Sequence, residues 1–128
     1  MIERVCAYFG IDPNAVLVNL HIITADEMRE VNREQRGLDK TTDVLSFPMI
    51  DFPSPVKTAD DLIPHILPWN LEPESGKLIL GEILVNQDET ETAFLTIHGM
   101  LHLLGHTHDT DADYDAMMKL TKEIQGEV

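Results

Sequence analysis

The sequence has 128 residues, of which 43% are hydrophobic and 25% charged, a composition typical of a soluble globular protein folding as a single domain over 1–128. Its 23 acidic and nine basic residues give a formal net charge of −14, which opposes binding to membranes and nucleic acids over most of the surface. A single cysteine excludes an internal disulfide, and no apolar run is long enough to cross a membrane, so we expect a cytoplasmic protein.

The N-terminal third of the chain predicts a helix, a strand and a second helix. Residues 1–9 have the pattern of a short helix, and the β-branched segment 15–23 lies between turn residues and predicts a strand. The second helix is expected over 25–36, because Thr24 and Glu27 have the spacing of a capping box.

Basic residues gather on this second helix and just beyond it. Arg29, Arg33, Arg36 and Lys40 are four of the nine cations, and the spacing of the arginines places them along one helix face. Two interpretations stay open. The face is either solvated, with its arginines paired to neighbouring glutamates, or a positive strip that binds phosphates on an otherwise acidic body.

A long loop separates the next two predicted strands. The segments 42–49 and 77–86 have strand composition, and residues 51–76 between them are rich in proline and acidic residues. A loop of this length in a small domain is usually functional or disordered.

The C-terminal third predicts two helices. Asp88 and Glu91 provide a capping signal for a helix over 89–105, and a final amphipathic helix is expected over 112–125. The side chains that this final helix offers to the core are Tyr114, Met117, Met118, Leu120 and Ile124. Because strands and helices do not alternate strictly, we expect an α+β fold, a small mixed sheet covered by helices.

Three histidines have the spacing of a metal site. His98 and His102 lie one turn apart on the predicted helix, and Gly105 can turn the chain so that His108 supplies a third nitrogen ligand. Three neutral imidazoles leave a tetrahedral Zn²⁺ with one open position, where a bound water ionises near pH 7. We therefore expect one zinc ion per chain at a helix end and the following turn, with His106 supporting the ligands from outside the set.

Other interpretations of the histidines remain. In the first, the histidines are scattered surface residues that bind no metal. In the second, a carboxylate from Asp109 or Asp111 joins two histidines in an iron site. Metzincin proteases share the histidine spacing, but they carry a glutamate beside the first histidine as the base for peptide hydrolysis. Gly99 stands at that position, which disfavours a peptidase.

Three segments, in this order along the chain, resemble the YbeY-type endoribonucleases, the bacterial ribosomal RNA maturation factors. The segment NREQRGLDKTTDVLSFP at 32–48 resembles the family's signature of an arginine followed by a strand. The segment LGEI at 80–83 resembles the family's Leu-Gly-Asp-Ile, and HGMLHLLGHTHD at 98–109 resembles its zinc signature. The resemblance implies a zinc-dependent endoribonuclease specific for single-stranded RNA. It also implies a role on ribosomal RNA precursors, in ribosome maturation and quality control.

The resemblance also implies individual residue roles. It places the zinc ligands at His98, His102 and His108 and a catalytic arginine at Arg36. It also places Asp43 and Ser46 in the cleft. Together with the basic strip, the residues expected to bind RNA are Arg29, Arg33, Lys40, Asp43 and Ser46.

The sequence also departs from the family pattern. His106 and Thr107 replace Tyr-Asp, Glu82 replaces an aspartate, the segment before His98 is short, and an N-terminal strand is missing. The alternative function, favoured by the charge of −14 and the missing base, is a non-catalytic zinc-binding factor. Ribosomal proteins or the small ribosomal subunit are the expected partners in either case.

Overall fold

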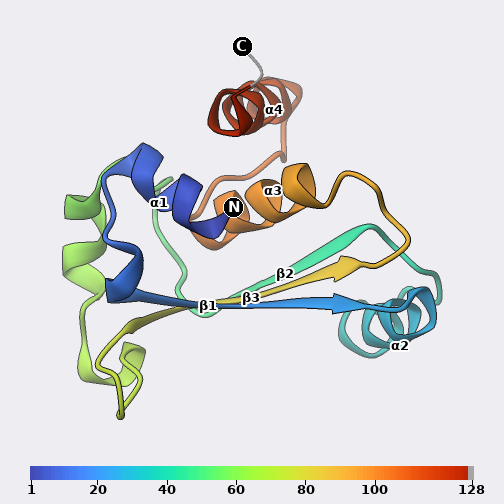
Figure 1. Ribbon diagram of the computed structural model, residues 1–128, viewed down its shortest axis with the longest axis horizontal. Helices are drawn as coiled ribbons and strands as arrows, with labels where there is room; N and C mark the ends of the chain where they lie inside the picture. The colour runs from blue at the N-terminus through green and yellow to red at the C-terminus, as the bar shows by residue number, and fades with distance from the viewer. Residues whose placement is uncertain (127–128) are drawn as a thin grey trace.

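The computed structural model describes residues 1–126 as a three-stranded sheet with helices on both faces (Figure 1). This arrangement confirms the expected α+β fold. In chain order the elements are α1 (Ile2–Phe9), η1 (Pro13–Ala15), β1 (Val16–Ile23), α2 (Ala25–Arg36), β2 (Val44–Pro48), η2 (Ala59–His65), η3 (Pro68–Asn70), β3 (Leu78–Asn86), α3 (Thr92–Leu103) and α4 (Asp111–Gln125), of which η1, η2 and η3 are short 3-10 helices.

The strand β3 is the centre of the sheet, in the order β1-β3-β2. It runs parallel to β1 and antiparallel to β2. A central strand is covered on both faces, which explains why LIL and ILV occur in β3 as nearly unbroken apolar runs. Glu82 is the exposed member of β3, and its Oε1 lies 3.5 Å from Nε2 of His21 on β1.

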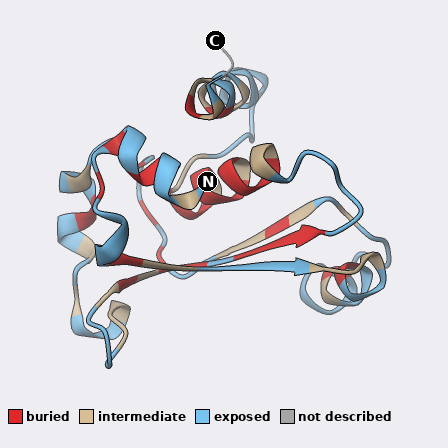
Figure 2. Cartoon of the chain, viewed as in Figure 1, coloured by how far each residue is buried: buried red, intermediate tan, exposed pale blue. Residues whose placement is uncertain are grey.

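The two faces of the sheet pack against different helices. Ile83 and Val85 belong to the main core, which includes α1, α3 and α4, whereas Leu84 between them packs against Met28 of α2 on the other face. Of all the helices, α3 is the most completely buried (Figure 2), because the sheet lies beneath it and α1 and α4 cover it. No helix within residues 1–126 is long and apolar enough to span a membrane.

Gly99 allows α3 to lie close to the sheet. A Cβ atom at this position would come within 2.8 Å of Cγ2 of Ile83, a side chain that has no exposed surface. Real Cβ atoms do not approach other atoms so closely, so any side chain at 99 must displace Ile83 or lift the helix. The glycine beside the first histidine therefore has a packing role.

Two details of the C-terminal helices differ from expectation. No side chain caps α3, which begins at Thr92, and the amide of Asp88 donates to Oδ1 of Asn86 in a turn, so the predicted capping signal was wrong. Tyr114 was expected in the core but is 50% exposed, because the first turn of α4 faces the histidine turn instead. Met117 and Ile124 are buried as expected.

The segment 51–76 is an ordered cover over one end of the core. It contains η2 and η3, and it buries the side chains of Phe52, Val56 and Leu62. Disorder, one of the two expectations for this segment, is therefore wrong. Asp51 and Phe52 also line the cleft described below.

Candidate metal centre and cleft

Two histidines one turn apart on α3 form the base of the candidate site. The Nε2 atoms of His98 and His102 lie 3.3 Å apart. Two nitrogens that bind one tetrahedral zinc at about 2.0–2.1 Å are themselves about 3.3–3.4 Å apart. The pair therefore fits a tetrahedral metal ion without any movement of the helix.

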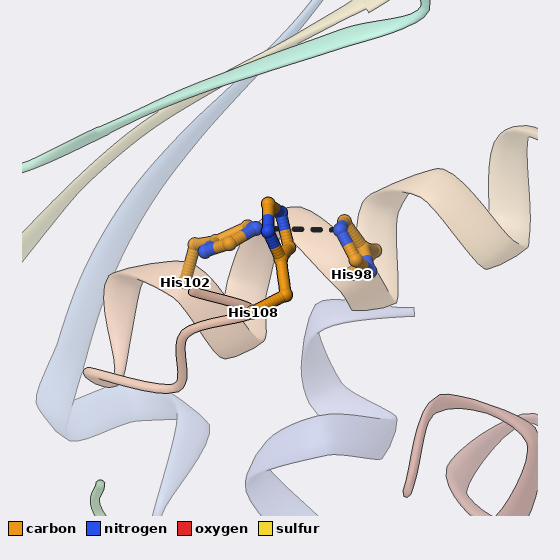
Figure 3. Close-up of side chains that lie close together, drawn as sticks. All are labelled: His98, His102 and His108. Atoms are coloured by element: carbon orange, nitrogen blue, oxygen red, sulfur yellow. Dashed lines mark hydrogen bonds between the residues drawn. The ribbon is translucent and has the colours of Figure 1, made fainter. Parts of the chain in front are cut away.

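The turn after α3 brings the third histidine back to this pair. Gly105 has φ +86°, and a Cβ there would meet the Cβ of Phe52 at 3.0 Å, so both conformation and space require glycine. The ring of His108 then lies 4.7 Å from that of His102 and 5.6 Å from that of His98 (Figure 3). One ligand nitrogen from each histidine falls within 4.8 Å of the other two, which is close enough to hold a metal ion.

The environment of these histidines favours the neutral form that binds metals. Burial, and to a smaller extent the neighbouring His98 and His108, lower the pKa of His102 to about 4. The pKa of His98 is lowered by burial and by His108. Both rings are therefore free of a competing proton at neutral pH.

The ring of His98 is oriented by packing. Its Nδ1 atom is buried and has no hydrogen-bond partner in residues 1–126. Ligand histidines usually donate the hydrogen of the second ring nitrogen to an acceptor that fixes the ring. Here the ring of Phe94 lies nearly parallel to that of His98, with centroids 6.2 Å apart and planes inclined by 12°.

The donor set consists of imidazoles alone. Within residues 1–126 no carboxylate joins the three histidines, and Asp109 and Asp111 lie outside the group. Nitrogen donors suit zinc, whereas the iron alternative needs a carboxylate ligand. The chemistry of the donors thus favours a three-histidine zinc site with an open position.

His106 connects the turn to the covering segment. Its Nε2 lies 3.0 Å from the carbonyl oxygen of Val56, and its ring packs 5.7 Å from that of Phe9. The amide of Val56 in turn donates to the carbonyl of Leu104. His106 is therefore outside the ligand group and ties the segment 51–76 to the histidine turn.

The three histidines lie in a cleft of about 860 Å³. The end of α2, the strand β2 and parts of α3 and α4 line it. Its lining side chains include Arg36, Asp43, Ser46, Phe94, Tyr114 and Met118. An open cleft that contains a candidate metal site is a typical place for a substrate.

Arg36 brings a positive charge to this cleft. One of its guanidinium nitrogens donates to the carbonyl oxygen of Ser46 at 3.2 Å, and the group lies 5.7 Å from the ring centroid of Phe47. These contacts leave other N–H groups of the guanidinium for a ligand. Arg36 is thus held against β2 on the wall that faces the histidines.

The other predicted RNA-binding residues separate into two groups. Asp43 and Ser46 line the cleft, whereas Arg29, Arg33 and Lys40 lie outside its lining on the exposed side of α2 and the loop after it. Arg29 pairs with Asp39 at 2.8 Å, and Arg33 pairs with Glu30. The Arg33 pair is one that the solvated-face interpretation expects, while Asp39 was not among the expected partners.

Sequence reasoning missed two aromatic residues of the cleft. Tyr114 was assigned to the core and Phe94 was not singled out, yet both line the cleft. Phe94 precedes His98 by four residues, so its position on the ligand face was available from helix geometry. For Tyr114 no comparable signal exists, since its place depends on the path of the chain between two helices.

The chain was compared with known proteins. The family model described as "Endoribonuclease YbeY" matches residues 1–128. Proteins named "Endoribonuclease YbeY" are similar to the chain in several bacteria. The protein from Exiguobacterium sibiricum is 34% identical over 141 residues, covering 97% of this chain and 82% of its own length. The protein from Clostridium perfringens is 34% identical, covering 87% of this chain and 73% of its own length. The protein from Lachnospira eligens is 31% identical, covering 88% of this chain and 75% of its own length.

Proposed function

Because the chain belongs to the Endoribonuclease YbeY family, we propose that it is a zinc-dependent endoribonuclease that cleaves single-stranded RNA, with residues 1–128 as one catalytic domain. The observation that carries the proposal is the pairing, across one cleft, of three histidines suited to a metal with the guanidinium of Arg36. A phosphodiester is anionic and resists cleavage in water. Positive charge on both sides of the phosphate stabilises the negative charge of the transition state and so favours cleavage.

His98, His102 and His108 are the residues that hold the ion. Zinc, when bound, supplies a Lewis acid and lowers the pKa of a bound water. The lowered pKa values of His98 and His102 favour the unprotonated form of both ligands at neutral pH. Phe94 keeps the ring of His98 aligned with the site.

Arg36 is the proposed catalytic residue. Its contacts with the Ser46 carbonyl and the Phe47 ring hold the planar guanidinium in a fixed orientation before substrate arrives. A fixed fork of N–H donors binds two phosphoryl oxygens at once, and it stabilises negative charge that increases in the transition state. Lysine offers only a point charge on a flexible stem.

Asp43 and Ser46 are proposed to contact the RNA beside the scissile phosphate. Oδ1 of Asp43 already accepts hydrogen bonds from the Val44 amide at 2.7 Å and the Thr42 hydroxyl at 3.4 Å. A fixed carboxylate cannot approach a phosphate, but it accepts well from a ribose hydroxyl. Contact with the 2′-hydroxyl distinguishes RNA from DNA.

Arg29, Arg33 and Lys40 are proposed to bind the backbone outside the cleft. The two arginines have carboxylate partners, but exposed ion pairs are commonly worth less than about 1 kcal/mol, so phosphates can replace these partners. Binding through this strip is expected to be independent of base sequence and to weaken with salt. The strip offers a positive path on a body whose formal net charge is −14.

Ribosomal RNA precursors are the proposed substrates, in ribosome maturation and quality control in the cytoplasm. The names of the related proteins support RNA cleavage. The second candidate is a non-catalytic zinc-binding factor that associates with ribosomal proteins or the small subunit. The charge of −14 and the glycine at 99 favour this candidate, because both weaken the case for a conventional hydrolase.

Cleavage of a defined RNA tests the proposal. Zinc-loaded protein is incubated with a single-stranded ribosomal RNA fragment and with the same fragment in a duplex, and products are resolved by gel. We expect cleavage of the single strand, its loss in His102→Ala, and its retention in His21→Ala, an exposed histidine beside Glu82. RNA binding without cleavage would support the non-catalytic factor, and neither binding nor cleavage would refute the endoribonuclease.

A further inference from the structure

Tyr114 is an exposed aromatic side chain in the candidate cleft. It lies in the first turn of α4, half of its surface is exposed, and it lines the same cleft as the histidines. Its ring centroid is 6.2 Å from that of His108, and the two planes are inclined by 68°. The ring of Tyr114 is therefore in a T-shaped contact with His108, while half of the residue's surface remains exposed.

The surroundings of Tyr114 form an apolar part of the cleft. Met118 follows one turn later on α4, and Phe94 lies on α3; both line the cleft. Arg36, Asp43 and Ser46, in contrast, come from the end of α2, β2 and the residue just before it. The cleft therefore offers polar groups suited to a sugar and phosphate at Arg36, Asp43 and Ser46, and a surface suited to a flat ring at Tyr114, Phe94 and Met118.

We propose that the ring of Tyr114 stacks against an unpaired nucleobase of the nucleotide next to the phosphate held at the histidines. The proposal rests on the proposed RNA cleavage and names how the cleft selects single strands. A base in a duplex is already stacked and paired, and it becomes available to an aromatic side chain only at an energetic cost. An unpaired base meets no such cost, because base–aromatic stacking accepts any base.

The volume of the cleft agrees with this assignment. About 860 Å³ is more than a metal ion and one phosphate require, and it lies within the range of pockets that enclose small organic ligands. The short separation between Tyr114 and His108 limits the stacked base to a nucleotide adjoining the reaction centre. A base further along the strand would have to fold back to reach it.

The chain offers a matched control in its second tyrosine. Tyr8 on α1 is 49% exposed, nearly the same as Tyr114, but its hydroxyl donates to Oε2 of Glu123 and it does not line the cleft. Loss of the Tyr8 ring removes similar exposed aromatic area at a distance from the histidines. A general effect of surface aromatics on RNA binding would therefore appear in both tyrosine variants.

Binding is measured first, by fluorescence anisotropy of zinc-loaded protein with a short single-stranded RNA that keeps its 2′-hydroxyls, and readings are taken before cleavage products appear. Stacking on one aromatic side chain commonly contributes enough that its loss raises Kd by about 5- to 150-fold. We expect an increase of that size for Tyr114→Leu, little change for Tyr114→Phe, and none for Tyr8→Leu. Melting temperatures of all three should stay near wild type, since both rings are half exposed.

An abasic scan of the RNA then identifies the stacked base. Each nucleotide in turn is replaced by an abasic residue that keeps its sugar and phosphate. For wild type, one position should weaken binding by a factor similar to that of Tyr114→Leu, and the same position should have no further effect in Tyr114→Leu. Equal sensitivity at every position in both proteins would overturn the stacking role while leaving RNA cleavage intact. Absence of any RNA binding by wild type would overturn the stacking role and the proposed function together.

Discussion

Replacing Gly99 with alanine tests how closely α3 packs against the sheet. The added methyl group would lie 2.8 Å from Cγ2 of Ile83 and 3.4 Å from its Cγ1. Ordinary carbon contacts begin near about 3.5 Å, so helix and strand must separate locally by about 0.7 Å. Ile83 cannot rotate away easily, because it is fully buried and its β-branched side chain is stiff at χ1.

Two opposing contributions determine the change in the free energy of unfolding. Forcing a methyl group into a packed core costs about 1–3 kcal/mol. Alanine in a helix interior is favoured over glycine by about 1 kcal/mol. The middle of the steric range, about 2 kcal/mol, exceeds the helix preference of about 1 kcal/mol. We therefore expect Gly99→Ala to destabilise the protein by about 1 kcal/mol.

Removing Ile83 should reverse the sign of this change. Ile83→Ala deletes Cγ2 and is itself expected to cost about 2–5 kcal/mol. In that background the methyl at 99 fills space, so the same Gly99→Ala change should stabilise by about 1 kcal/mol, a coupling of about 2 kcal/mol. The assay is urea denaturation of the four proteins of the cycle, followed by circular dichroism.

An exposed helix position provides the control for helix preference. Ala116 lies in α4 on the exposed surface, and Ala116→Gly should destabilise by about 1 kcal/mol without any steric contribution. If Gly99→Ala stabilises the protein with Ile83 present, or if the cycle is additive within about 0.5 kcal/mol, the close approach of α3 to β3 does not limit residue 99.

The remaining predictions concern the metal, the arginine and pH. Purified protein should contain one zinc per chain by elemental analysis, and His98→Ala or His108→Ala should lose it; full occupancy after removal of both would refute the ligand set. Arg36→Lys should keep metal content and melting temperature but reduce RNA cleavage about tenfold or more, so unchanged activity would show that charge alone matters. Because the pKa of His102 in the folded protein is about 4 against 6.5 for the free side chain, protonation favours unfolding. Metal-free protein should therefore lose about 2 kcal/mol of stability as pH falls from 6.5 to 4, after allowance for its partial solvent contact. His102→Gln should show a smaller loss over this pH range in urea denaturation.

Sequence patterns predicted those features of the fold that depend on local chemistry. The capping box of Thr24 and Glu27 forms as expected, with hydrogen bonds of 3.1 Å in both directions, and the helix it begins ends at Arg36. The spacing of the histidines likewise needs only one helical turn and one glycine. These signals involve residues that are close in sequence, so they can be recognised without knowledge of the rest of the structure.

Features that depend on distant parts of the chain could not be predicted in this way. Helical periodicity predicts burial on one face of α4 only where the core covers that face. At Tyr114 it does not, because this residue lies against the turn that carries His108. The contact of Arg36 with the Ser46 carbonyl joins an exposed helix end to an edge strand ten residues later. Neither the pairing of β2 with β3 nor the course of 51–76 over the core has a local signature.

The packing of Gly99 also limits how the cleft can perform chemistry. A glutamate at 99, as in metalloproteases, would need space that Ile83 fills, so that position cannot carry an acid without displacing the sheet. The contact that holds α3 on β3 therefore disfavours a general base at residue 99. Arg36 brings a positive side chain to the cleft and the three histidines offer a place for a metal cation, whereas Asp43 adds a carboxylate to the same lining. For the proposed cleavage we therefore expect electrostatic stabilisation of the phosphoryl oxygens by Arg36 and a bound metal, rather than proton removal by an acid at residue 99.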